Sequence, residues 1–152
     1  MEPPARSARQ RKLDTLSRLE NDIDCWVSTA DPATGTPYLV PLSFLWYEGR
    51  LLIATPADSP TGRNLQSTKK VRIGLGPTRD VVLIEATVDQ VLPTVDIPGP
   101  IGDRYAEQSG WDPRRSPGYA FFWIRPERLQ AWREVGELTG RELMRDGRWT
   151  VD

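Results

Sequence analysis

The sequence predicts a mainly β fold, a small closed antiparallel barrel decorated with short helices. Two observations predict this class. Six or more apolar, β-branched runs are separated by short Gly-, Pro- and Asp-containing turns, and helical patterns are too few and too short to alternate with the strands. At 152 residues the chain is long enough to bury one core, so we expect a single domain over residues 1–152, with residues 1–5 disordered.

The first half of the chain predicts a helix followed by an antiparallel meander. Leucines at three- to four-residue spacing predict an amphipathic helix over residues 6–20. Apolar runs separated by the turns at 31–35 and 48–49 predict three strands, at 25–29, 38–47 and 51–55. Pro41 lies inside the second strand and predicts a sheet edge or a bulge there, because proline cannot donate a ladder hydrogen bond.

The second half predicts further strands and two short helices. A helix over 59–70 begins with Ser59 or Thr61 as its cap, and a second helix over 103–110 is capped by Asp103. A Pro- and Gly-rich loop covers 93–102, and the strands are expected at 71–75, 81–92, 119–124 and 129–134, with a final hairpin in 141–150.

Composition excludes several classes of protein. There is no histidine, so a Ser-His-Asp triad and histidine-ligated zinc or haem are excluded, and with one cysteine we expect neither a disulfide nor a metal site. A net charge of -1 gives no general attraction to nucleic acid. No apolar run approaches the roughly 20 residues of a membrane span, so we expect a cytoplasmic protein. Redox chemistry would therefore depend on a bound organic cofactor.

The turn after the third strand carries a phosphate-binding pattern. Thr55, Ser59, Thr61, Arg63 and Asn64 fall within ten positions, around the expected start of a helix. Hydroxyls, an arginine and the free amides of a helix N-terminus together suit a phosphate group. Two alternatives remain open: Arg63 is an ordinary surface arginine, or Asn64 only satisfies nearby backbone groups.

Aromatic residues in the late strands predict a partner surface. A barrel of this size is expected to leave Phe122, Trp123 and Trp132 partly exposed, and the chain contains six tryptophans. Exposed aromatic side chains near arginine are typical of protein interfaces. We therefore expect a homodimer.

Three sequence runs resemble a known group of proteins. They are T-P-x-x-S-x-T-x-R-N-L from residue 55, V-R-I-G-L-G-x-T-R-D-V-V-L-I-E from residue 71, and A-W-R-E-x-x-E-L-x-G-R-x-L-M-R-D-G-x-W from residue 131. Over residues 16–149 the chain resembles the pyridoxamine 5'-phosphate oxidase-like, FMN-binding split-barrel superfamily. Within it, the chain is most similar to the actinobacterial oxidoreductases that use FMN or the deazaflavin coenzyme F420.

The resemblance implies a homodimeric, six-stranded split barrel with cofactor sites in the dimer cleft. By this resemblance the end of the second strand faces the flavin ring, the turn and helix start hold the phosphate, and the second subunit contributes late-strand residues. The corresponding residues here are Val40, Pro41, Leu42 and Ser43 for the ring, Thr55, Ser59, Thr61, Arg63 and Asn64 for the phosphate, and Trp123, Trp132 and Arg133 from the partner.

Two departures from the family pattern limit the activity that the resemblance implies. Thr61 stands where many relatives carry lysine, and losing one charge-assisted hydrogen bond of about 1.5–3 kcal/mol weakens phosphate binding by roughly tenfold or more. The arginine- and histidine-bearing substrate segment of the true pyridoxamine phosphate oxidases has no counterpart, so oxidation of that substrate is not expected.

The expected function is hydride transfer from F420 or FMN to a small unsaturated or quinone-like substrate in the dimer cleft. No catalytic acid or base is evident, which agrees with a cofactor that carries the chemistry. The alternative is a non-catalytic protein that stores, transports or senses a flavin or deazaflavin. Loops at 93–102 and 109–118 would set the substrate. The acidic tail of F420 would need a basic groove, for which the candidates are Lys69, Lys70, Arg72, Arg114 and Arg115.

Overall fold

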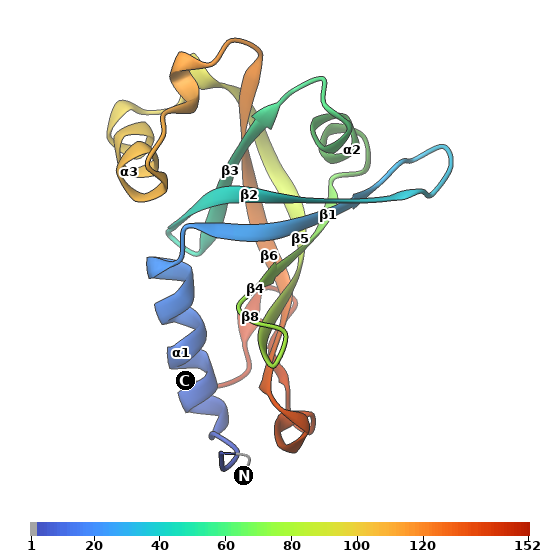
Figure 1. The fold of residues 1–152 in the computed structure, drawn as a ribbon, viewed down its shortest axis with the longest axis vertical. Coiled ribbons are helices and arrows are strands. Elements are labelled where there is room, and N and C mark those ends of the chain that lie inside the picture. The colour runs from blue at the N-terminus through green and yellow to red at the C-terminus, as the bar shows by residue number, and fades with distance from the viewer. Residues whose placement is uncertain (1–2) are drawn as a thin grey trace.

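The computed structural model describes residues 3–152, which form an antiparallel β-barrel with short helices around it (Figure 1). The helices are α1 (Ala8–Asn21), α2 (Pro60–Thr68) and α3 (Gly99–Ser109), with 3₁₀ turns at Thr94–Asp96, Pro113–Arg115 and Val135–Glu137. The strands are β1 (Asp24–Ala30), β2 (Pro37–Tyr47), β3 (Arg50–Pro56), β4 (Lys70–Leu75), β5 (Asp80–Pro93), β6 (Tyr119–Arg133), β7 (Glu142–Arg145) and β8 (Arg148–Trp149).

Six strands close the barrel. They follow one another in the order β3-β2-β1-β4-β5-β6, and a further pairing of β3 with β6 joins the two ends. Every pairing is antiparallel, and the β7–β8 hairpin continues the sheet beyond β6. The predicted mainly β, six-stranded barrel with short helices is therefore confirmed.

Strand β2 is split between two neighbours. Its first part, Pro37 to Ser43, pairs with β1, whereas its second part, Phe44 to Tyr47, pairs with β3. From Pro37 to Ser43, β2 pairs with β1 on one side only. On the other side β3 has separated from it, so this edge of β2, at Pro41, has no strand beside it. The expectation of a sheet edge at Pro41 is confirmed, because the missing N–H costs nothing on an unpaired edge.

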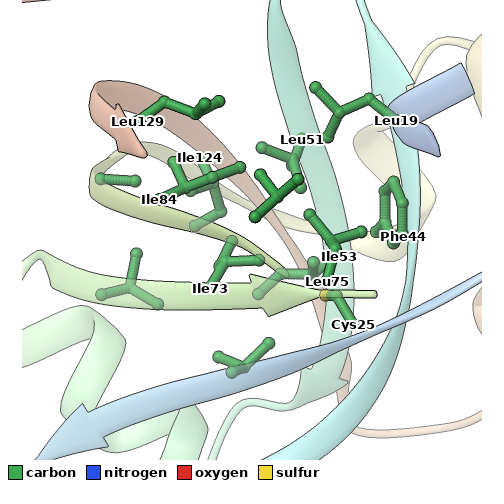
Figure 2. Close-up of a cluster of buried hydrophobic side chains, with 14 of the residues drawn as sticks. Leu19, Cys25, Phe44, Leu51, Ile53, Ile73, Leu75, Ile84, Ile124 and Leu129 are labelled. Atoms are coloured by element: carbon green, nitrogen blue, oxygen red, sulfur yellow. The ribbon is translucent and has the colours of Figure 1, made fainter. Parts of the chain in front are cut away.

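The barrel interior is an apolar core, shown in Figure 2. It is built from alternate residues of all six strands, such as Ile53, Ile73 and Ile84, and Leu19 of α1 packs into it. The other face of β3 is buried as well, because α3 covers it: Leu52 packs with Tyr105 of α3 in a second cluster. Both faces of β3 are therefore apolar, which explains its unbroken hydrophobic run.

The expected exposure of Phe122 and Trp123 is wrong. Phe122 lies inside the barrel with no exposed surface, and Trp123 is only 4% exposed in the cluster beneath α3. Because α3 and the loop before it cover the outside of β6, this strand buries both of its faces. Trp132, near the end of β6, is half-buried.

The start expected for the helix over 103–110 is also wrong. Helix α3 begins at Gly99 rather than Asp103, since Pro100 lies in its first turn, where a proline ring fits without breaking a hydrogen bond. Asp103 lies one turn inside the helix and forms an ion pair with Arg114 at 2.8 Å. The loop expected over 93–102 is therefore partly helical.

The last two long strands expected from the sequence form one. Strand β6 runs continuously from Tyr119 to Arg133, with Pro126 in its middle. Pro126 lies opposite Ala86, where the β5–β6 register shifts. Such an irregularity accommodates a proline without ending the strand.

A buried ionic cluster fixes α1 against the lower end of the barrel. The Glu137 carboxylate, 1% exposed, accepts hydrogen bonds from the Arg6 side chain at 2.8 and 3.0 Å, the Arg6 N–H at 2.8 Å and the Arg133 N–H at 2.7 Å. Burial raises the pKa of this carboxyl, but the hydrogen bonds outweigh burial and lower its pKa to about 2. Arg11 donates to the Glu137 carbonyl at 2.9 Å.

The expectation of disorder for residues 1–5 concerns in part residues 1 and 2, which lie outside the described residues. The carbonyl of Pro4 accepts a hydrogen bond from Arg133 at 3.1 Å. No helix among residues 3–152 is long and apolar enough to cross a membrane.

Candidate functional site

A groove of about 530 Å³ opens where β2 and β3 separate. The unpaired edge of β2 forms one wall, and the turn from β3 into α2 forms another. The remaining wall is aromatic and comes from the loop after α3 and the start of β6. The lining residues are Asp24, Tyr38, Val40, Pro41, Leu42, Ser43, Ala54, Thr55, Pro56, Ser59, Pro60, Thr61, Trp111 and Tyr119.

Local sequence determines the shape of the β3–α2 turn. Ser59 caps α2: its hydroxyl accepts from the Gly62 N–H at 3.0 Å and donates to the Pro56 carbonyl at 2.7 Å. A Cβ atom at Gly62 would lie 2.3 Å from that same carbonyl, so only glycine allows this close approach. The Thr55 hydroxyl lies 3.4 Å from that of Ser59, so the turn presents grouped hydroxyls to the groove.

Seven of the twelve residues predicted for the site line this one groove. Two separate stretches of sequence supply them, the edge of β2 and the β3–α2 turn. They are Val40, Pro41, Leu42, Ser43, Thr55, Ser59 and Thr61.

Arg63 and Asn64 lie beside the groove rather than in its wall. Both line an adjoining hollow of about 340 Å³, which shares Tyr38 and Pro60 with the groove. Arg63 is exposed and donates to the Asp58 carbonyl at 2.7 Å. Asn64 is buried and donates to the Thr29 hydroxyl at 3.1 Å, so it ties α2 to β1.

The three residues expected from a partner subunit lie elsewhere in the chain. Trp123 packs under Arg50, whose guanidinium lies 4.2 Å from the ring centre. Trp132 and Arg133 lie at the other end of β6, opposite Val81 and Asp80 of β5. Within one chain these three residues do not reach the groove.

Four charged or aromatic lining residues were not singled out from the sequence: Asp24, Tyr38, Trp111 and Tyr119. Trp111 belongs to the loop at 109–118, which was expected to shape the cleft, but nothing in its pattern marked this residue. Its ring packs edge-on against Tyr119 at 5.4 Å and Tyr105 at 6.4 Å. These contacts join residues from α3, the following loop and β6, so only the fold reveals the aromatic wall.

The residues present suit a planar ring that carries a phosphate. The apolar β2 edge and the aromatic wall fit the ring, and the hydroxyls of Thr55 and Thr61 at the start of α2 fit the phosphate. No lysine or arginine of residues 3–152 lines the groove, and the basic candidate is Arg63, which lines the adjoining hollow.

The basic residues considered for an acidic cofactor tail do not converge on the groove. Arg114 is engaged by Asp103 and Asp112 at 2.8 and 2.9 Å. Lys70 and Arg72 line a different hollow, over β1, β4 and β5. In the described part of the chain, no group of three or more metal-ligand side chains is placed to hold a metal ion.

The closed barrel, the divided β2 and the groove in the division define a split-barrel protein. The sequence profile of the family described as pyridoxamine 5'-phosphate oxidase matches residues 16–133, so the chain belongs to this family. No curated protein sequence is significantly similar to the chain.

Several solved structures share the fold at low sequence identity. An F420 reductase is 17% identical, with a TM-score of 0.62 over 74% of this chain and 93% of that one. A putative pyridoxamine 5'-phosphate oxidase from Listeria innocua is 15% identical, with a TM-score of 0.60 over 83% and 98%. HutZ, the haem storage protein from Vibrio cholerae, is 13% identical, with a TM-score of 0.63 over 84% and 99%. At these identities the likeness establishes the fold alone.

Proposed function

We propose that the protein is an oxidoreductase that binds coenzyme F420 or FMN in the groove between the β2 edge and the β3–α2 turn. It would reduce a small unsaturated or quinone-like substrate. The observation that carries this proposal is the convergence of the apolar β2 edge and the hydroxyl-bearing turn on one groove. Family membership and the resemblance to an F420 reductase support the choice of cofactor class.

Each wall of the groove has a role in this proposal. The hydroxyls of Thr55 and Thr61 hold the phosphate, and Arg63 in the adjoining hollow is the candidate cation. Ser59 shapes the turn as the cap of α2. The edge from Val40 to Ser43 supports one face of the ring. Trp111 and Tyr119 exclude water from one side.

When bound, the cofactor supplies a hydride to an electron-poor double bond or quinone, and solvent or the substrate supplies the accompanying proton. The chain itself contributes orientation rather than acid–base chemistry. Holding the ring and substrate in near-attack geometry is sufficient for a large part of the rate, because it removes the entropic cost of the encounter.

We further propose a homodimer, now through a different surface from the late aromatic residues. Trp26, Leu39 and Leu83 are 52%, 60% and 43% exposed on neighbouring strands, and Gly74 lies between Trp26 and Leu83. They surround a shallow hollow of about 330 Å³ on the outside of the barrel. Leu39 is next to the groove residues Tyr38 and Val40, so a second copy on this face would lie close to the groove.

If this surface forms the dimer, one charged substitution in it should have a large effect on the oligomeric state. Trp26→Glu would bury a carboxylate in an apolar contact, so we expect it to convert a dimer into a monomer. Val95→Glu is the matched control, because Val95 is 82% exposed but lies on the 3₁₀ turn after β5. Sedimentation velocity measures both variants, and a dimer that survives Trp26→Glu would contradict this surface.

A non-catalytic ligand carrier is the second candidate. Thr61 stands where many relatives carry lysine, so phosphate binding is expected to be weaker. A haem storage protein shares the fold, which supports a carrier. Haem itself would find no imidazole ligand, because the chain contains no histidine. A carrier would bind the same groove without turnover.

Turnover under anaerobic conditions separates the two candidates. Purified protein is mixed with chemically reduced F420 or reduced FMN and a simple quinone, and reoxidation of the cofactor is followed optically against a protein-free control. An oxidoreductase accelerates reoxidation in proportion to enzyme concentration. Tight cofactor binding without acceleration by any acceptor would assign the protein to the carrier class.

A further inference from the structure

Among residues 3–152, one charged side chain lines the groove, that of Asp24. Asp24 lies where β2 leaves β3: Ser43 pairs with Asp24 of β1, and the next residue, Phe44, pairs with Ile53 of β3. No arginine or lysine in residues 3–152 forms an ion pair with this carboxylate at 4.0 Å or less. Its charge is therefore available to whatever occupies the groove.

The carboxylate is held in a defined orientation. The Ser43 hydroxyl donates to Asp24 Oδ1 at 2.8 Å. Ser43 is fixed from the other side, because its carbonyl accepts a hydrogen bond at 3.1 Å from the hydroxyl of Tyr105, which has no exposed surface. The second carboxylate oxygen, Oδ2, makes no hydrogen bond within the described residues, so it can accept one from a ligand.

The groove consequently has two chemically different regions. The β3–α2 turn presents the hydroxyls of Thr55 and Thr61 at a helix N-terminus, which favours an anion. The β1–β2 junction presents a carboxylate, which repels an anion and favours an N–H donor. A ligand fits both regions when it has a phosphate at one end and a ring N–H at the other.

We propose that Asp24 is a specificity-determining residue that accepts a hydrogen bond from a ring N–H of the ligand whose phosphate lies at the α2 turn. The inference rests on the proposed function, since it takes the cofactor to occupy this groove. Flavin and deazaflavin share the imide N–H that would serve as the donor. A ligand with a carboxylate at that end, such as haem with its propionates, is repelled.

The test uses FMN and FMN methylated at the imide nitrogen N3, titrated into wild-type protein and Asp24→Asn. Asparagine keeps the size of the side chain, and its oxygen can still accept from Ser43, but it loses the charge. Asp22→Asn is the matched control, because Asp22 lies two residues away and outside the groove lining. Thermal unfolding of each variant checks that the fold is retained.

The expected result is a tenfold or greater loss of FMN affinity in Asp24→Asn, as for loss of a charge-assisted hydrogen bond. Asp22→Asn should bind FMN as the wild type does. Methylated FMN should bind the wild type more weakly than FMN and should be insensitive to Asp24→Asn. Unchanged FMN affinity in Asp24→Asn, or equal losses for both ligands, would overturn this inference alone. If neither FMN nor F420 binds the wild type, the proposed function fails and this inference with it.

Discussion

The two ends of the barrel differ in whether their polar side chains bond to the rest of the chain or face a groove. At the α1 end, Glu137 receives four hydrogen bonds and links Arg6 to Arg133 across most of the chain. At the α2 end, the edge of β2 is unpaired, and the hydroxyls of Thr55 and Thr61 face a groove. At the first end the carboxylate is bonded within the chain, whereas at the second the Thr61 hydroxyl makes no hydrogen bond within residues 3–152.

This difference separates stability from binding. A buried ionic cluster around a carboxylate that accepts four hydrogen bonds holds the fold, and removing that carboxylate leaves buried guanidinium groups with fewer partners. An open groove contributes little to the fold, so its polar groups are free to meet a ligand. Substitutions at the α1 end should therefore change unfolding, and those at the α2 end should change affinity.

The largest expected effect is on stability, from Glu137→Ala. It leaves the guanidinium groups of Arg6 and Arg11 partly buried without their carboxylate, so we expect a loss of about 3–5 kcal/mol in the free energy of unfolding. Urea denaturation measures this loss. Cofactor affinity of the folded variant should remain as in the wild type, and a loss of less than about 1 kcal/mol would contradict a stabilising role for the cluster.

The same carboxylate predicts how stability depends on pH. Its pKa is lowered from 4.5 to about 2 in the folded chain, so the unfolded chain takes up the proton first. The stabilisation is complete above about pH 4.5 and is lost as the pH falls toward 2, on the order of 2 kcal/mol after solvent screening.

Denaturation curves between pH 2 and pH 6 measure this contribution. Glu137→Gln should flatten the acid limb of the wild-type profile, because the titrating group has been removed. Parallel profiles for the two proteins would show that other carboxylates cause the acid instability.

A smaller effect is expected at the groove. Thr61→Val keeps the shape of a buried side chain but removes its hydroxyl, so FMN affinity should fall by roughly ten- to hundredfold, the worth of one hydrogen bond to a charged phosphate. Riboflavin, which has no phosphate, should bind both proteins equally. Thr68→Val is the control on the same helix: its hydroxyl bonds to the Asn64 carbonyl, outside the groove. If Thr68→Val weakens FMN binding as much as Thr61→Val does, the phosphate position is wrong.

The sequence predicts what depends on nearby residues. Alternation and turns located most strands, and the T-P-x-x-S-x-T pattern located the turn that forms one wall of the groove. The start of α3 was misplaced although Pro98-Gly99-Pro100 is a local signal, because Asp103 also resembles a cap.

Features that join distant segments could not be predicted in this way. Glu137 and Arg6 are 131 positions apart, and Trp111 enters the groove through contacts with α3 and β6. Asp24 acquires its place only when β2 passes from β1 to β3, a register that no local pattern encodes. The burial of Trp123 likewise depends on where α3 packs.

The most direct test of the central claim compares phosphorylated and unphosphorylated ligands in one titration. Tryptophan fluorescence of the wild-type protein is followed while FMN, F420 and riboflavin are added separately. Binding through the β3–α2 turn predicts saturable quenching by FMN or F420 at low micromolar concentration and at least tenfold weaker binding of riboflavin. Riboflavin binding as tight as FMN, or no saturable quenching by FMN or F420, would contradict the assignment of this groove as a phosphate-dependent cofactor site.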